Sequence, residues 1–217
     1  ALSRAGKKIA YYKPLQCGGL LKGGIVSPDL ALVKELSNIP DDSLANDYCF
    51  SLAASPHLAA EYDKLKVDIN TIKNHNRLLL NKYDFVLVEG AGGLIVPLTR
   101  NYTVLNLIQD LSVPVLIVAR SGLGTINHTS LTINALKQSE MPILGVIFNY
   151  YKGGIIEEDN KVIINAQNNV PIIGVVPFSD NLKDLADNFE KYVDIKKFYI
   201  WKLELPKDLY ISITTIK

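Results

Sequence analysis

Five short apolar runs, rich in β-branched residues, most strongly constrain what this chain can fold into. Runs without polar interruption are typical of strands buried on both faces, as in a parallel sheet covered by helices. Segments with helical spacing lie between them, at 31–36, 126–138 and 182–192, and Ser55-Pro56-His57 precedes a helix predicted from Leu58 to Lys66. This alternation predicts an α/β fold with a doubly wound, mostly parallel sheet flanked by helices. The five predicted strands are 8–12, 85–88, 113–119, 143–148 and 172–176.

Length and charge narrow the function classes. The 217 residues, 48% hydrophobic and 21% charged, predict one globular domain over residues 1–217. Lys and Arg total 23 against 22 Asp and Glu, so no overall field gathers nucleic acid or an anionic membrane, and neither partner is expected. The two cysteines, Cys17 and Cys49, lack metal-ligand or disulfide spacing, which fits a reducing, cytoplasmic setting.

The strongest local signal follows the run 85–88. In open α/β sheets, ligands bind beyond the carboxyl ends of the strands. There the chain continues as Glu89-Gly90-Ala91-Gly92-Gly93. The glycines allow backbone N–H groups to approach an anion, and Glu89 offers oxygen to a hard cation, so the pattern suits a magnesium polyphosphate. The alternative is a plain strand-to-loop turn with a solvated glutamate.

A second glycine-rich turn follows the run 113–119 and reads Ser121-Gly122-Leu123-Gly124-Thr125-Ile126-Asn127-His128. Free N–H groups and the dipole of the following helix favour a carboxylate or phosphate there. The alternative is that Thr125 simply caps the helix. For His128, a packing role is favoured over a catalytic one.

Other strand ends and loops carry polar or rigid residues as well. Lys13-Pro14 follows the first run, Asp29 stands at a predicted helix start, Asn149 ends the fourth run, and Pro177 ends the fifth. Each has an ordinary explanation as a surface charge, a cap or a turn residue. Their convergence at one edge of the sheet predicts a shared polar site.

These residues, in this order and spacing, resemble the ATP-dependent dethiobiotin synthetases, a family of the P-loop NTPase superfamily. The matching segments are 12–16, 27–29, 55–57, 88–94, 97–98, 123–128, 131–132, Asn149, Gly174 and Pro177. The resemblance implies ATP-dependent carboxylation of 7,8-diaminononanoate with CO2 and closure to a cyclic urea through a phosphorylated carbamate. It implies Lys13 as the catalytic lysine and Asp29 and Glu89 as ligands of Mg²⁺.

The resemblance also implies the binding residues. The ATP-binding set is Asp29, Glu89, Gly90, Ala91, Gly92, Asn149, Pro177, Phe178 and Ser179, with the last four near adenine. The substrate carboxylate would meet Gly124, Thr125, Ile126 and Asn127 across a homodimer interface. Cys17 stands where the family usually has Ser or Thr to hydrogen-bond the carbamate, and a thiol is a weaker donor.

One family motif does not occur in the 217 residues: GxxxxGK followed by Ser or Thr. In the family this phosphate loop follows a first, central strand, just before the position that matches Ala1. We therefore expect a chain truncated at its N-terminus, with in-frame upstream DNA encoding the loop. Loss of that strand is expected to leave unpaired backbone edges in the sheet. Residues 1–217 alone are expected to turn over little or no ATP.

Two other functions fit the same residues. One is a non-catalytic, ligand-binding descendant of the fold that has lost the phosphate loop. The other is a cobyrinate-type P-loop amide ligase, which shares the Glu-Gly-Ala-Gly-Gly turn but usually adds a glutaminase domain, for which no length remains. The apolar run 210–216 has no assigned place in the predicted sheet.

Overall fold

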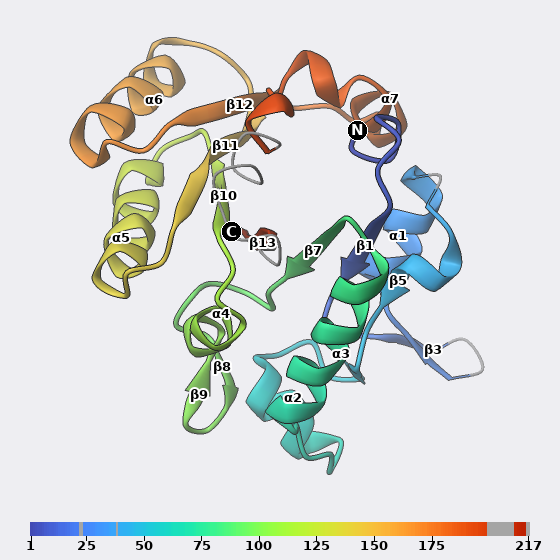
Figure 1. Ribbon diagram of the computed structural model, residues 1–217. Helices are drawn as coiled ribbons and strands as arrows, with labels where there is room; N and C mark the ends of the chain where they lie inside the picture. The colour runs from blue at the N-terminus through green and yellow to red at the C-terminus, as the bar shows by residue number, and fades with distance from the viewer. Residues whose placement is uncertain (22–23, 38, 199–210, 216–217) are drawn as a thin grey trace.

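The computed structural model describes residues 1–21, 24–37, 39–198 and 211–215 (Figure 1). Its main feature is a seven-stranded sheet in the order β12-β11-β10-β13-β7-β1-β5, with every neighbouring pair parallel. This confirms the predicted parallel sheet, and all five predicted runs form strands within it. The strands are β1 (Ile9–Tyr12), β5 (Leu44–Ala45), β7 (Phe85–Glu89), β10 (Val115–Arg120), β11 (Ile143–Tyr151), β12 (Ile172–Pro177) and β13 (Ile211–Thr215).

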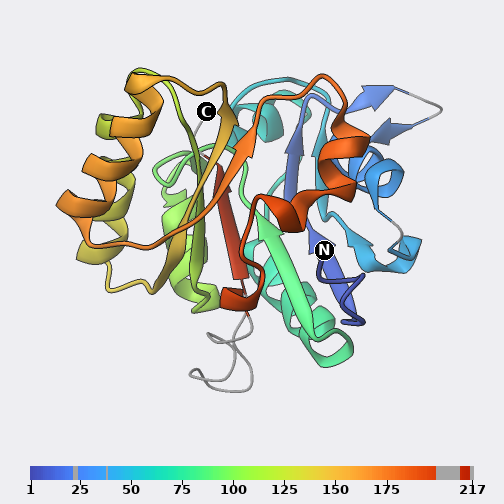
Figure 2. The same cartoon turned by 90° about the horizontal axis from the view of Figure 1, so that it is seen from above.

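Alternation along these strands feeds two hydrophobic cores, one on each face of the sheet. In β7, Val86 and Val88 belong to the larger core, whereas Phe85 lies in the smaller one and Leu87 packs against it. Side chains of a strand point alternately to opposite faces, so an apolar run must be covered twice. Figures 1 and 2 show the consequence, with α3, α4 and α5 along one face and α1 and α7 on the other.

The helices differ in part from the prediction. The predicted helix 58–66 runs instead from Pro56 to Tyr62. Lys64, two residues beyond its end, has a left-handed φ of 57°. The Ser55 side chain makes no cap hydrogen bond at its start. The segment 182–192 is broken into a helix and a 3₁₀ turn (Phe189–Lys191). The helices are α1 (Pro28–Leu36), α2 (Pro56–Tyr62), α3 (Ile69–Lys82), α4 (Val104–Leu111), α5 (Thr125–Gln138), α6 (Ile155–Asn168) and α7 (Leu182–Asp187).

Helix α3 occupies a segment for which the sequence predicted no helix. The Asp68 carboxylate accepts a hydrogen bond from the N–H of Asn70 and caps the helix, while Ile72 and Leu79 bury its apolar stripe. Most of its residues are polar, so the apolar stripe is narrow. The helix therefore forms mainly through packing on the sheet.

The expected gap in the centre of the sheet is not found. Strand β13 lies between β7 and β10 and pairs in parallel with both, with Ile211 opposite Leu87 and Ser212 opposite Val115. The backbone edges predicted to be unpaired there are therefore paired. The neighbouring residues 199–210 and 216–217 lie outside the described residues, so within the run 210–216 only the β13 backbone has a place in the sheet.

Three short two-stranded sheets lie outside the main one. The pair β2 (Leu15–Cys17) and β6 (Tyr48–Phe50) is parallel and continues the chain beyond β1. The others are antiparallel pairs, β3 (Leu20–Leu21) with β4 (Ile25–Val26) and β8 (Pro97–Thr99) with β9 (Tyr102–Thr103). Among the helices of the described part of the chain, none has the length and apolar character needed to cross a bilayer.

Candidate functional site

Three of the predicted site residues meet at one edge of the sheet. Lys13 follows β1 and is buried, with only 7% of its surface exposed. Its Nζ lies 2.6 Å from Asp29 Oδ2 and 2.7 Å from Glu89 Oε1. Asp29 comes from the first turn of α1, and Glu89 is the last residue of β7. The ordinary explanation of Lys13 as a solvated surface charge is therefore wrong.

The charges in this cluster stabilise the protonated lysine. Burial alone would lower the pKa of Lys13, but the charges of Glu89 and Asp29 and their hydrogen bonds hold this pKa above its ordinary value. Tyr11 adds a donor, because its hydroxyl lies 2.6 Å from Glu89 Oε2. Burial, with the charge of Glu89, raises the pKa of Tyr11, so the hydroxyl stays protonated. One cation between two carboxylates leaves a site with net negative charge.

Asp29 is available to Lys13 because another residue caps α1. Ser27 Oγ accepts a hydrogen bond from the N–H of Leu30 at 3.2 Å and donates to Gln16 Oε1 at 2.9 Å. The alternative that Asp29 serves as the cap is therefore wrong. Ser27 and Gln16 are both buried, so they fix the start of the helix and thereby the direction of the Asp29 side chain.

The lysine cluster separates two cavities. The larger one, about 670 Å³, extends from Lys13 to Asn149, Tyr150 and Arg120 at the ends of β11 and β10. The other, about 450 Å³, contains Cys17 and the segment 53–56. Lys13, Asp29 and Gly92 line both cavities. A molecule in either one would therefore contact the same charged groups.

Cys17 lines the second cavity as a neutral thiol. Burial raises the pKa of Cys17 to about 11, a shift that the nearby charge of Lys13 only partly offsets. Because a neutral thiol is a poor hydrogen-bond donor, it would bind a carbamate more weakly than a hydroxyl does. Its side chain lines the same cavity as Lys13 and Asp29.

The glycine-rich turn after β7 has the backbone freedom that the sequence predicted. Gly92 has a φ of +88°, and a Cβ there would lie 2.9 Å from Val96 Cγ2. Gly90 and Gly92 line the larger cavity, and Ala91 lines the second one. The turn can thus bring its backbone close to an anion held above Lys13.

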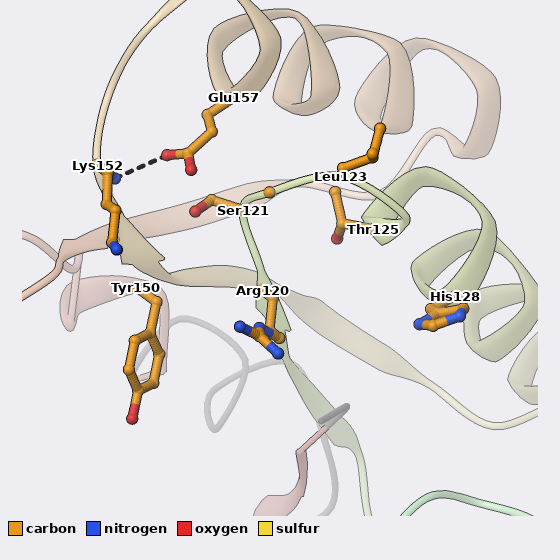
Figure 3. A pocket seen from close by; sticks show the side chains of 9 residues that line it. Arg120, Ser121, Leu123, Thr125, His128, Tyr150, Lys152 and Glu157 are labelled. Carbon is orange, nitrogen blue, oxygen red and sulfur yellow. Dashed lines mark hydrogen bonds between the residues drawn. The ribbon is translucent and has the colours of Figure 1, made fainter.

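The second glycine-rich turn lines a third cavity of about 370 Å³ (Figure 3). Gly124, with a φ of +92°, is the N-cap residue of α5, so Thr125 is not the cap; its Oγ1 instead lies 3.0 Å from Thr129 Oγ1. Ser121, Gly122, Leu123 and Thr125 line the cavity, whereas Ile126 and Asn127 do not.

The other walls of this third cavity carry charge. Arg120, Lys152 and Glu157 line it (Figure 3), and Arg120 and Tyr150 also line the largest cavity. His128 lines it too and is exposed, so the packing role expected for this histidine is wrong. The buried Ser121 Oγ has no hydrogen-bond partner among the described residues. The carboxylate of Glu157 accepts from the N–H groups of Lys152 and Gly153.

The predicted adenine residues are only partly brought together. Asn149 lines the largest cavity, but Pro177, Phe178 and Ser179 do not. Phe178 connects to it indirectly, since its ring centroid lies 5.9 Å from that of Tyr150 and its N–H donates to the carbonyl of Tyr151 at 2.8 Å. Ser179 Oγ accepts from the N–H of Asn181 and so begins the turn into α7.

Asp29 and Glu89 suit a divalent cation bound together with phosphate. No described Asp, Glu, His or Cys joins them to make a group of three. Mg²⁺ typically binds proteins through one or two carboxylates and takes its other ligands from phosphates and water. The oxygen donors of these two side chains therefore fit Mg²⁺. In this structure the positive charge between the two carboxylates is that of Lys13.

Sequence reasoning missed Tyr11, Arg120 and Tyr150. Tyr11 lies two positions before Lys13, and residues at this spacing share a face of an extended segment. The two-residue period of a strand could therefore have placed Tyr11 beside Lys13. Arg120 is the last residue of β10, one position beyond the predicted strand. Tyr150 has a positive φ of 61°, which no local pattern indicated.

Comparisons with known proteins identify similar proteins over most of the chain. A family model described as "AAA domain" matches residues 1–186. ATP-dependent dethiobiotin synthetase of Clostridium acetobutylicum is 37% identical over 87% of this chain and 82% of its own length. The enzyme of that name from Fusobacterium nucleatum is 35% identical over 87% of this chain and 84% of its own length. The one from Halalkalibacterium halodurans is 38% identical over 82% of this chain and 75% of its own length.

Among solved structures, the MinC:MinD cell division protein complex of Aquifex aeolicus matches with a TM-score of 0.54 and 18% identity, over 97% of this chain and 89% of that one. At that identity the likeness shows the fold alone. It confirms the predicted fold class, a parallel sheet flanked by helices of the P-loop NTPase type. With sequence identity above 30% over most of its length, the chain belongs to the ATP-dependent dethiobiotin synthetase family.

Proposed function

We propose that residues 1–217 belong to a single cytoplasmic domain of an enzyme of biotin biosynthesis. This enzyme joins CO2 to 7,8-diaminononanoate and closes the ring at the expense of ATP. The observation that supports this most is the buried Lys13 between Asp29 and Glu89, with a cavity on either side. One cavity has room for a nucleotide and the other for a diamine. Lys13 lines both cavities, so its positive charge would be near the phosphoryl group as it passes from the nucleotide to the carbamate.

The chemistry proceeds in three steps that balance. One substrate amine attacks CO2, forms a C–N bond and loses a proton, giving a carbamate. A carbamate oxygen then takes the terminal phosphoryl group of ATP, and ADP leaves. Finally the second amine attacks the carbamoyl carbon and loses a proton, the C–O bond to phosphate breaks, phosphate leaves and the cyclic urea forms. Lys13 offers a fixed positive charge to the carbamate oxygens and to the transferring phosphoryl group, where charge develops in the transition state.

The nucleotide would lie along the carboxyl ends of the strands. Asn149 and the lysine cluster both line the largest cavity. We place the adenine base beside Asn149 and the phosphates beside the lysine cluster. Asp29 and Glu89 would hold Mg²⁺, which neutralises phosphate charge when bound. The backbone of Gly90 and Gly92 lines this cavity and would orient phosphate oxygens, and that of Ala91 lines the second cavity, where it would orient the carbamate.

The carboxylate of the diamine would meet the start of α5 in a second copy of the chain. Gly124, Thr125, Ile126 and Asn127 form the first turn there, where N–H groups favour an anion. Apolar side chains are exposed beside it, with Leu123 95% and Ile155 86% exposed. Such a surface suits burial in a homodimer.

The test measures carbamate formation. Because residues 1–217 contain no GxxxxGK motif, binding is a more direct measurement than turnover. The protein is mixed with 7,8-diaminononanoate and carbon-labelled bicarbonate, and the bound carbamate is detected by NMR. The wild type and Lys34→Met, a substitution in an exposed ion pair, are expected to show it, and Lys13→Met is expected to lose it. A wild type that binds neither diamine nor ADP in calorimetry overturns the proposal.

A further inference from the structure

The main chain around Lys13 is held by one neighbouring segment. The N–H of Lys13 donates to the carbonyl of Ala45 at 2.9 Å, and Asn46 Nδ2 donates to the Lys13 carbonyl at 2.6 Å. The N–H of Asp47 then donates to the carbonyl of Pro14 at 3.2 Å. Lys13 thus lies where the chain leaves β1 for β2, and the segment 45–47 fixes both sides of its backbone.

The hydrogen bonds from segment 45–47 take the place of a longer pairing between β1 and β5. β1 pairs with β5 through only two residue pairs, Tyr11 with Leu44 and Tyr12 with Ala45. The regular pairing therefore ends immediately before Lys13. On that side, the position of the lysine depends on the hydrogen bonds of Asn46 and Asp47 rather than on a long ladder.

Asp47 itself is fixed by two side chains from different elements. Its carboxylate is nearly buried, with 7% of the side chain exposed. Oδ2 accepts a hydrogen bond from the hydroxyl of Tyr12, which is fully buried, and Oδ1 lies 2.5 Å from Nδ1 of His75. The rings of Tyr12 and His75 are 5.1 Å apart, so the three side chains form one contiguous group.

His75 is the link between this group and α3, which Figure 1 shows along the sheet at its β1 and β5 end. A buried carboxylate is costly unless it is paired, and His75 is the one basic side chain that pairs with Asp47 in the described part of the chain. Neither Asp47 nor His75 lines any of the cavities around Lys13. Their influence on the site must therefore pass through Tyr12 and the 45–47 segment.

We propose that Asp47 and His75 are positioning residues, which hold Lys13 between Asp29 and Glu89 by fixing Tyr12 and the main chain on either side of the lysine. Catalytic groups must be held within about 0.5 Å of their productive geometry, and the short β1–β5 pairing does not provide this alone. The inference rests on the proposed function for the role of Lys13. Its test, however, requires no turnover.

The test follows the accessibility of the Lys13 amine. The folded protein is acetylated with an N-hydroxysuccinimide ester at neutral pH, and the rate at each lysine is read by peptide mass spectrometry. In the wild type, Lys13 reacts slowly because it is buried and doubly paired. His75→Leu is expected to raise the Lys13 rate at least five-fold and leave the exposed Lys34 unchanged. His75→Asn keeps an N–H donor near Asp47 and is expected to stay within two-fold of the wild type.

One control and one further variant separate positioning from loss of stability. Ile133→Val trims a buried side chain of α5 outside the Lys13 region and is expected to leave the Lys13 rate unchanged while lowering stability. Tyr12→Phe breaks the group from its other end and keeps the test valid if His75→Leu fails to fold. It too is expected to raise the Lys13 rate at least five-fold.

The outcomes are distinct. An unchanged Lys13 rate in folded His75→Leu or Tyr12→Phe overturns the inference. An equal rise in Ile133→Val also overturns it, because the effect would then be general loosening. If the wild type binds neither diamine nor ADP but Lys13 becomes reactive in His75→Leu, the proposed function is wrong while the structural link from His75 to Lys13 is supported.

Discussion

Lys13 Nζ lies 2.7 Å from Glu89 Oε1, although 76 positions separate the two residues in the chain. Each stands at the end of a strand, and β1 pairs directly with β7. Parallel strands bring their carboxyl ends to one edge of the sheet, so the pair is a direct result of the fold. It joins the two cavities around the site and is the basis of the first two predictions.

Replacing Lys13 with Met leaves Asp29 and Glu89 facing each other without a cation. Loss of one partner from a largely buried ion pair costs stability, and since both carboxylates are partly exposed we expect about 1–3 kcal/mol, below the full buried value. Urea unfolding measures it. The exposed pair of Lys34 with Asp41 provides the control, and Lys34→Met is expected to change stability by less than about 0.5 kcal/mol. Equal losses in the two variants would contradict a special role for Lys13.

The stabilisation from Lys13 depends on pH in the alkaline range. Its pKa in the folded protein is raised above the ordinary value of 10.5, so folding favours the protonated lysine. The contribution is complete below pH 10.5 and is lost as the pH rises through the higher folded-state pKa. The difference in unfolding free energy between wild type and Lys13→Met is therefore expected to be constant from pH 7 to 9 and to shrink above 10.5. A difference that grows with alkaline pH would show the opposite sign.

Gly92→Ala is expected to destabilise the turn after β7 by about 1–2 kcal/mol, because the φ of +88° disfavours a side chain and the new Cβ would meet Val96. Gly93→Ala is the matched control, since a Cβ at this adjacent position has open space and no positive φ. Thermal and urea unfolding measure both. Equal stability of the two variants would show that the conformation of Gly92 is not required.

Cys17→Ser is expected to strengthen carbamate binding a few-fold, since a hydroxyl donates a better hydrogen bond than a thiol, worth about 0.5–1.5 kcal/mol. With its pKa raised to about 11, Cys17 is also expected to react slowly with iodoacetamide at pH 7 and faster as the pH approaches 11. Calorimetry with diamine and bicarbonate, and alkylation followed by mass spectrometry, measure the two effects. Fast alkylation at neutral pH would show that the thiol is not shielded.

Arg120→Ala is expected to weaken binding of anionic ligands about five- to ten-fold, because this guanidinium lines both the largest and the third cavity and has no ion-pair partner among the described residues. Calorimetry with ADP and with 7,8-diaminononanoate shows which anion it serves. Arg100→Ala, which breaks an exposed pair with Glu61, is the control and is expected to leave both affinities unchanged. No change in either affinity for Arg120→Ala would exclude it from the site.

The amino-acid sequence was sufficient to predict the fold class and the meeting of charged side chains at one edge of the sheet. Apolar runs at 8–12 and 85–88 predicted buried parallel strands, and the polar residues after them, Lys13 and Glu89, then had to share one edge. Both conclusions depend on local periodicity and on a general rule of parallel sheets, which a sequence carries directly.

Only the tertiary structure decided which side chains support that edge. The grouping of Tyr12 with Asp47 and His75 joins a strand, a loop and α3, and the sequence suggested no helix around His75. The placement of β13 between β7 and β10 likewise depends on long-range pairing. The residue pattern within one element does not specify which other elements become its neighbours. Contacts between distant segments are therefore decided only when whole elements pack together.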